Sequence, residues 1–218
     1  MSKIRLAIFD LDHTLVSTNI SFAFGKFLFL KGKMPLSCML RSSAAYFAHK
    51  VLGTSLEKVH NQILKAYLNR LPKEDLTSLS SEFIDKKLNG LLDPKVVEEM
   101  NKAYREGALI SLCTSSPDFL VSLIASKLSI ELWCASRYKF DKRGYLCKID
   151  PIVNGPEKAS FIQKVLEKEK ISREEVIAYS DSFLDLPMFE LSGHPVAVNP
   201  DRRLKRHSLL KNWRVLNT

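Results

Sequence analysis

The sequence predicts an α/β protein: a parallel sheet flanked by helices, with a bundle of helices inserted near its start. Several short apolar runs have the length and residue types of buried strands, and each ends in small polar residues or acids. Right-handed crossovers would bring all these strand ends to one edge of the sheet. Residues 16–88, by contrast, show helical spacing and no convincing strand. We therefore expect a discontinuous core of residues 1–15 and 89–218 and a separate helical domain of residues 16–88.

Each expected element has its own signal. Five strands are expected from the apolar runs: Ile4–Phe9, Ala108–Cys113, Ile130–Ala135, Val176–Tyr179 and Pro195–Val198. Helices are expected at residues 93–107, 118–128 and 158–168, from about Pro187, and over residues 201–207. Asp93-Pro94 is typical of a helix start, because proline is tolerated at the first helical position. Residues 138–148 indicate a hairpin that turns at Lys142-Arg143-Gly144.

The composition is that of an ordinary globular protein, with 45% hydrophobic and 26% charged residues in 218. Its richest apolar stretch, Ser21–Leu30, is about half the ~20 residues that a membrane span needs. We interpret the opening apolar run as a core strand and not as a signal peptide, and so expect a cytoplasmic location. The cysteines Cys38, Cys113, Cys134 and Cys147 form no C-x-x-C pair, which favours reduced, buried thiols over a zinc site or disulfides.

The formal net charge of +9 would suit an anionic partner such as nucleic acid, lipid or a phosphorylated small molecule. No Asp or Glu lies between His13 and Leu56. That segment holds the cations Lys26, Lys31, Lys33, Arg41 and Lys50. It is expected to face either an anionic ligand or an acidic part of its own protein. In the first case, charge reversal at Lys31 and Lys33 should raise KM for the substrate.

Two features argue against macromolecular partners. The basic run at residues 201–207 has no interleaved aromatic residues for stacking, so no nucleic-acid partner is expected. The aromatic cluster Phe22, Phe24, Phe27 and Phe29 is interpreted as the core of the helical domain and not as a lipid-binding face. Contact with a membrane surface therefore remains only an alternative.

Acidic, hydroxyl and basic side chains follow the predicted strands or begin a helix nearby. The pooled residues are Asp10, Asp12, Thr114, Lys158, Asp181 and Asp185. Carboxylates without Cys or His ligands describe a site for a hard cation, and Mg²⁺ commonly binds one or two carboxylates, waters and a substrate phosphate. Phosphoryl transfer needs such a metal, an in-line nucleophile, and donors or cations on the phosphoryl oxygens. The set therefore favours phosphoryl-transfer chemistry.

Each pooled residue has an expected role. Asp10 can be the nucleophile that forms an aspartyl phosphate, and Asp12 the general acid and base for the leaving alcohol and the water. Thr114 can donate a hydrogen bond to a phosphoryl oxygen. Lys158 can neutralise the phosphate and the nucleophile. The expected metal residues are Asp10, Asp12 and Asp181, with Asp185 in a supporting position.

Taken in order, these motifs resemble those of the haloacid dehalogenase-like superfamily. The pattern is D-x-D-x-T at residues 10–14, Ser/Thr after a strand at Thr114, Lys at 158, and D-x-x-x-D at residues 181–185. Residues 114–117, 179–187 and 193–200 are similar, more narrowly, to the phosphoserine-phosphatase-like branch, subfamily IB. The resemblance implies a Rossmann-like core, a helical cap domain at residues 16–88, Mg²⁺ dependence, and hydrolysis of a phosphomonoester through an aspartyl phosphate.

Substrate contacts are expected from Asn19, Thr114, Ser115, Ser116, Lys158 and Ser182. Backbone N–H groups near Ser115 and Ser116 can bind phosphate at the start of a helix. The chain departs from the family pattern at two positions. His13 stands where the family usually has Gly, so it alters the turn or contacts the substrate. Asn19 stands where phosphoserine phosphatases carry Glu for the substrate ammonium, so free phosphoserine is not the expected substrate.

Other functional classes remain to be weighed. Asp12 argues against a response-regulator receiver and against a dehalogenase, because neither needs this second acid. A phosphotransferase or phosphomutase, and a lipid-phosphate phosphatase, would share the fold and stay open. The alternative that is not an enzyme is a non-catalytic basic binding protein. The presence of a suitable residue at every expected catalytic position argues against it. The sequence therefore predicts a Mg²⁺-dependent phosphomonoesterase that acts on a small phosphorylated metabolite.

Overall fold

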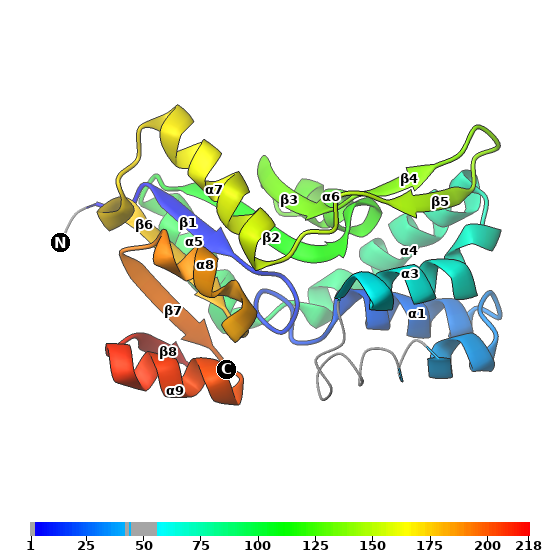
Figure 1. The fold of residues 1–218 in the computed structure, drawn as a ribbon, viewed down its shortest axis with the longest axis horizontal. Helices are drawn as coiled ribbons and strands as arrows, with labels where there is room; N and C mark the ends of the chain where they lie inside the picture. Colours follow the sequence, from blue (N-terminus) through cyan, green and yellow to red (C-terminus); the bar gives the residue numbers. More distant parts are fainter. Residues whose placement is uncertain (1–2, 42–43, 45–55) are drawn as a thin grey trace.

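The computed structural model describes residues 3–41, 44 and 56–218, and a six-stranded parallel sheet forms its centre (Figure 1). In sheet order the strands are β3 (Leu132–Ser136), β2 (Leu109–Pro117), β1 (Leu6–Phe9), β6 (Val176–Ser180), β7 (His194–Val198) and β8 (Arg214–Leu216). All neighbouring pairs are parallel. The α/β fold class and the five expected strands are confirmed. The central position of β1 places the residues after it in the middle of the carboxyl edge.

Helices cover both faces of the sheet. One face carries α5 (Pro94–Arg105) and α6 (Asp118–Lys127), and the other carries α7 (Gly155–Glu169), α8 (Leu186–Glu190) and α9 (Arg202–Lys211). The 3₁₀ turns η2 (Arg173–Glu175) and η3 (Phe183–Asp185) flank β6. Alternation along β1 explains the two cores: Ala7 and Phe9 pack with α5 and α6, while Leu6 and Ile8 pack with α7, α8 and α9. A strand buried on both faces reads as a continuous apolar run.

The sixth strand, β8, was not expected from the sequence. It has only three residues and none of them is fully buried, so its apolar signal is too short to stand out. Its place depends on contacts with distant segments. Arg214 forms a two-point ion pair with Glu99 of α5, which also accepts a hydrogen bond from Tyr179 of β6.

The inserted helices, which we define as α1 (Ile20–Leu30), α3 (Leu56–Ala66) and α4 (Lys73–Leu91), lie beyond the carboxyl edge of the sheet (Figure 1). The 3₁₀ turn η1 (Leu68–Arg70) joins α3 to α4. The expected boundary between residues 88 and 89 falls inside α4, which continues to Leu91. The chain crosses twice between the two parts here, and Ser17 and Asp93 donate backbone hydrogen bonds to Leu91 and Leu15, respectively.

The expected hairpin is confirmed as β4 (Tyr138–Phe140) and β5 (Leu146–Ile149), with Gly144 in the left-handed conformation at the turn, at φ +81°. It packs against the inserted helices. Pro72 pairs with Tyr145, and the backbone N–H of Lys73 donates to the carbonyl of Gly144 at 2.9 Å. A segment far outside residues 16–88 therefore completes this part of the molecule.

The aromatic cluster of the inserted helices is confirmed in part. Phe24 and Phe27 are buried and lie 5.3 and 5.5 Å from the ring of Phe83 on α4. Phe29 is partly buried against the same core. Phe22 is 44% exposed and lines a cavity, so its assignment to the core was wrong.

Charge and cysteine expectations have mixed outcomes. Lys31 lies 2.6 Å from Glu82 of α4, so for this lysine the acidic partner is the protein itself. Lys50 lies outside the described residues. Cys38 and Cys113 are buried and Cys134 is half-buried, but Cys147 on β5 is exposed, which corrects the expectation of buried thiols. Across the part of the chain that the structure describes, no helix combines the length and apolar character that a membrane span requires.

Candidate active site

The loop after β1 brings Asp10 and Asp12 to the middle of the sheet edge. The backbone N–H of Asp10 donates to the carbonyl of Tyr179 on β6, which ties the end of β1 to its neighbour. His13 has a φ of +56°, a left-handed conformation that costs a non-glycine residue about 1 kcal/mol. The family pattern has Gly at this position, so the departure falls where the turn itself demands unusual backbone geometry. His13 also lines the cavity.

Lys158 lies between two aspartates. Its Nζ donates to Asp10 Oδ1 at 2.6 Å and to Asp185 Oδ2 at 2.8 Å. The hydroxyl of Ser180 donates to the same oxygen of Asp185 at 2.6 Å. All three charged residues are buried, with 4–5% of their surface exposed. Ion pairs this deeply buried have little competition from water, so they hold Asp10 in a defined orientation.

Helix α7 positions Lys158 in its first turn. Asn154 and Glu157 form a reciprocal capping box, which fixes where this helix begins. Gly155 allows the close approach to the motif around Asp185, because a Cβ there would lie 2.2 Å from the carbonyl oxygen of Leu184. The chain therefore begins α7 three residues before the expected position, and the cap and the glycine explain why.

Burial and neighbouring charges set the pKa values at this site. Burial raises the pKa of Asp10 well above its ordinary value; Lys158 opposes this shift, while Asp185, Asp181 and Asp12 add to it. Burial would lower the pKa of Lys158, but Asp10 and Asp185 outweigh it and keep this pKa above its ordinary value. One buried cation thus stands among several carboxylates, and a second cation would relieve the remaining repulsion.

The carboxylate of Asp12 accepts three hydrogen bonds. Oδ2 accepts from Ser116 Oγ at 2.8 Å and from Asn19 Nδ2 at 2.9 Å, and Oδ1 accepts from the backbone N–H of Ile20 at 2.8 Å. Asn19 also accepts from the backbone N–H of Phe22 and so caps α1. Both polar ends of Asn19 therefore hold Asp12 and α1 in place. The sequence suggested Asn19 and Ser116 as substrate contacts, and their link to Asp12 was missed.

The segment after β2 contributes hydroxyl groups. Thr114 is fully buried, and its Oγ1 accepts from the backbone N–H of Ser116 at 3.1 Å. Ser115 and Ser116 line the cavity, whereas Thr114 lies behind this surface. The expected hydrogen bond from Thr114 to a phosphoryl oxygen therefore stays a prediction.

Asp181 and Ser182 line the cavity from the loop after β6. The backbone N–H of Asp201 donates to the carbonyl of Asp181 at 2.8 Å, and the Asp201 side chain accepts from Phe183 N–H. These bonds fix the loop. All the expected site residues except Thr114 are therefore brought to the wall of one cavity.

The donor set fits a hard divalent cation. Within the described ranges, no three His, Cys, Asp or Glu side chains stand together as a ready metal cluster. Mg²⁺ needs only one or two protein carboxylates, with water and phosphate as the other ligands. Asp10 and Asp181 meet this need, since both line the cavity and the charge of Asp181 acts on Asp10. The carboxylate of Asp12 accepts from three donors and Asp185 accepts from Lys158, and the metal roles expected for these two acids stay predictions.

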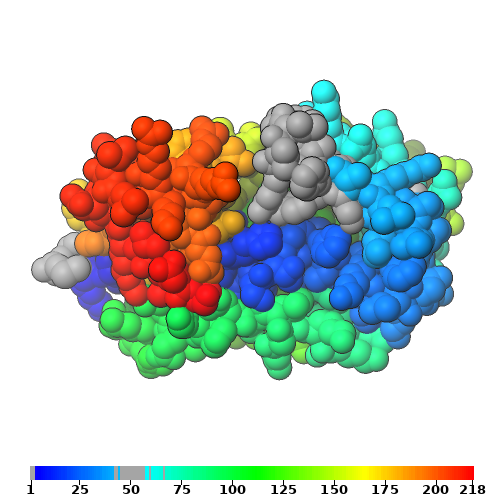
Figure 2. Space-filling view, turned by 90° about the horizontal axis from the view of Figure 1, so that it is seen from below, coloured from blue at the N-terminus to red at the C-terminus, as the bar shows by residue number. Residues whose placement is uncertain are grey.

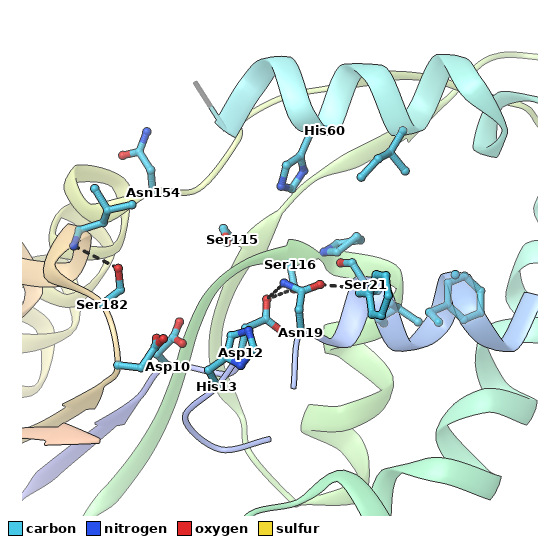
Figure 3. Close-up of a pocket in the computed structure, with 18 of the residues that line it drawn as sticks. Asp10, Asp12, His13, Asn19, Ser21, His60, Ser115, Ser116, Asn154 and Ser182 are labelled. Atoms are coloured by element: carbon cyan, nitrogen blue, oxygen red, sulfur yellow. Dashed lines mark hydrogen bonds between the residues drawn. The ribbon is translucent and has the colours of Figure 1, made fainter. Parts of the chain in front are cut away.

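The cavity continues from these carboxylates to the inserted helices and has a volume of about 560 Å³. Figure 3 looks into it, with Asp10, Asp12 and His13 on the side of the sheet and His60 pointing in from α3 across from them. Figure 2 shows the loop after β1 between the C-terminal elements and the inserted helices. His60 and Tyr138 also line the cavity and were not expected there, because an isolated histidine and a hairpin tyrosine carry no local functional signal.

Comparisons with known proteins agree on one family. The family model described as haloacid dehalogenase-like hydrolase matches residues 7–190. The chain is 27% identical to the histidinol-phosphatase of Neisseria meningitidis, over 98% of both chains. It is 28% identical to a probable phosphatase of Mycobacterium tuberculosis, over 97% of this chain and 74% of that protein. The solved structure of a phospho-aspartyl intermediate analogue of phosphoserine phosphatase is similar in fold, with a TM-score of 0.70 at 17% identity, over 98% of this chain and 100% of that one.

Proposed function

This chain belongs to the haloacid dehalogenase-like hydrolase family and is a phosphatase, and from this premise we propose that it is a Mg²⁺-dependent phosphomonoesterase. The proposal assigns its chemistry to an aspartyl phosphate on Asp10 and its substrate to the phosphorylated small molecules. We also propose a cytoplasmic location for the protein. Residues 16–88, together with the hairpin, would form a cap over the site.

One observation carries the proposal: Asp10 and Asp12 are held in different environments two residues apart. Asp10 is buried against Lys158, which binds Oδ1, and we assign the attack on phosphorus to its other oxygen. Asp12 is held by three donors at the cavity wall, where it can exchange protons with a leaving group. Two carboxylates in different surroundings can take different roles in one reaction.

The reaction then follows in two displacements. Asp10 forms a bond to phosphorus as the bond to the alcohol oxygen breaks, and Asp12, which enters this step protonated, gives its proton to the departing alkoxide. In the second step Asp12 takes a proton from water, the water oxygen attacks phosphorus, and the bond from Asp10 to phosphorus breaks. Inorganic phosphate leaves and Asp10 is restored. Lys158 lies where charge develops on the phosphoryl group, and we assign to the hydroxyl of Thr114 a hydrogen bond to the same group.

Mg²⁺ would be held by Asp10 and Asp181, and it would supply charge neutralisation on the phosphoryl oxygens. A nearby divalent cation would favour the ionised form that the nucleophile needs.

Hydrolysis of p-nitrophenyl phosphate tests the proposal. We expect turnover that requires Mg²⁺ and that falls by about a thousandfold or more in Asp10→Asn. Asp85→Asn is the matched control, because Asp85 lies on the exposed face of α4 and pairs with Lys127. Turnover in Asp10→Asn equal to the wild type would contradict the assignment of the nucleophile. No turnover by the wild type, together with no binding of BeF₃⁻ in Mg²⁺, would contradict the enzyme itself.

A further inference from the structure

The cavity has two chemically different ends. Its charged side chains, among the described lining residues, lie at the catalytic edge and at the neighbouring start of α9, where Asp201, Arg202 and Arg203 contribute. At the far end, α1, α3 and the segments beside them present apolar side chains. These include Phe22, Phe24, Leu28, Met34, Ile63 and Leu68. A phosphoester bound with phosphorus at Asp10 would direct its alcohol group into this apolar end.

Gly25 of α1 keeps the apolar end open. It lines the cavity, and among the described residues a Cβ at this position would have no atom within 4 Å apart from its chain neighbours and the backbone of its own helix. Most helical positions between two layers carry a side chain that fills the gap, because protein interiors are close-packed. Here the missing side chain leaves room beside Phe22 and Phe24 that a ligand can take.

Two polar side chains at the apolar end, Tyr138 and His60, contact each other. The hydroxyl of Tyr138 lies 2.9 Å from Nδ1 of His60, and both residues line the cavity and are less than 10% exposed. Burial raises the pKa of Tyr138, so this hydroxyl stays neutral. The pair can accept or donate a hydrogen bond, but it supplies no carboxylate to an ammonium group.

We infer that the cognate substrate is the monophosphate ester of a largely apolar alcohol, alkyl or aromatic, whose hydrocarbon part fills the end of the cavity between α1 and α3. This inference rests on the proposed function and names its substrate class. A volume of about 560 Å³ lies within the range of roughly 300–1,000 Å³ that is usual for sites of drug-sized ligands. An amino-alcohol phosphate would bury an ammonium group among apolar side chains, which is strongly unfavourable without a partner.

Phosphate release from a graded series of esters tests the inference. The series runs from methyl to octyl phosphate, with phenyl and naphthyl phosphate as the aromatic arm and phosphoserine and histidinol phosphate as the charged arm. We expect kcat/KM to rise by about fourfold per methylene group until the cavity is full. The alkyl and aromatic arms distinguish the two sources of apolar alcohol, and the charged arm should give the lowest values.

Gly25→Leu sharpens the test because it fills the cavity without removing a contact. We expect the variant to lose the gain from the longer chains while its Tm is unchanged or higher, since a helical Gly is replaced by a better helix former. Gly90→Leu is the matched control. Gly90 is also a helical glycine with no atom within 4 Å of a built Cβ, but it lies on the exposed surface of α4 away from the cavity.

The possible outcomes separate this inference from the proposed function. A rising series that becomes flat in Gly25→Leu and stays steep in Gly90→Leu supports it. A flat series, or a preference for phosphoserine or histidinol phosphate, overturns the apolar substrate class and leaves the phosphatase in place. Absence of phosphate release from every ester overturns the proposed function and this inference with it. Equal slopes in the two glycine variants would overturn the assignment to the end of the cavity beside α1.

Discussion

The candidate active site and the outer face of the inserted helices each hold a cluster of three charged side chains. In the first cluster a cation lies between two acids, and in the second an acid lies between two cations. At the centre, Lys158 lies between Asp10 and Asp185, at 2.6 and 2.8 Å. On α4, Glu82 lies between Lys31 and Lys86, both at 2.6 Å. The distances are nearly equal, but the Lys158 side chain is 4% exposed and the Lys31 side chain is 40% exposed.

Burial, and not the distance between the charged atoms, decides how much each cluster contributes to stability. Water screens the surface cluster, so its ion pairs restrain two long side chains for little gain in stability. Hydrogen bonds from Lys31 and then Lys86 lower the pKa of Glu82, which is the ordinary result for a solvated acid beside cations. In the buried cluster, water cannot take the place of a missing charged partner, so the removal of one charged side chain leaves the others buried and unpaired. The buried cluster is therefore expected to be sensitive to substitution, and the surface cluster tolerant.

The largest expected effect follows from Lys158→Met. The substitution leaves Asp10 and Asp185 buried without their cation, so we expect the free energy of unfolding to fall by about 3–5 kcal/mol. Urea denaturation followed by circular dichroism measures this change. The phosphatase activity should be lost as well, because Asp10 loses the group that orients it.

Lys31→Met is the control for this substitution, because Lys31 makes a bond of the same length on the surface. Its denaturation midpoint should match that of the wild type. KM should also be unchanged, since Lys31 contacts Glu82 and is not among the residues that line the cavity. Similar losses of stability in the two variants would contradict the role that we give to burial.

A smaller effect is expected from Ser116→Ala, which removes one of the three hydrogen bonds to Asp12. A hydrogen bond to a charged group contributes about 1.5–3 kcal/mol, so we expect kcat to fall by about tenfold or more. Asn19 and the backbone of Ile20 would still hold the carboxylate in part. A rise in KM with kcat unchanged would mean that Ser116 contacts the substrate and does not position Asp12.

The smallest effect is expected at a pair of intermediate burial. Glu99 receives two hydrogen bonds from Arg214 and one from Tyr179, and its side chain is 21% exposed. Glu99→Gln should lower the free energy of unfolding by about 1 kcal/mol at neutral pH. Arg214, and to a lesser extent Tyr179, lower the pKa of Glu99 below its ordinary value of 4.5.

The pH dependence of this variant has a defined sign. Because the pKa of Glu99 is lower in the folded protein, its contribution is fully present above pH 4.5 and is lost as the pH falls below that value. The difference between wild type and Glu99→Gln should therefore be constant near neutral pH and disappear in acid. A difference that grows as the pH falls would contradict the ion pair with Arg214 as its cause.

The proposed catalytic residues were predictable from the sequence because each one lies at the end or the start of a recognisable element. Asp10 and Asp12 end an apolar strand, Asp181 follows another, and Lys158 lies in the first turn of a helix. Strand and helix periodicity are local properties of the chain. Because parallel strands end at one edge of the sheet, the residues that follow them are expected to lie together there. The five strands, the hairpin and the helical insertion were predictable for the same reason.

Only the tertiary structure decided what surrounds these residues. Ser116 and Asp12 are 104 positions apart in sequence, and His60 and Tyr138 are 78 apart, so no local pattern predicts either contact. The short strand β8 and the docking of the hairpin on α3 likewise depend on partners from distant segments. The sequence by itself determined the reactive groups and the edge that they share. Packing between distant segments decided which acid is buried beside Lys158, which acid accepts hydrogen bonds from Ser116, Asn19 and Ile20, and that the cavity beyond them is largely apolar.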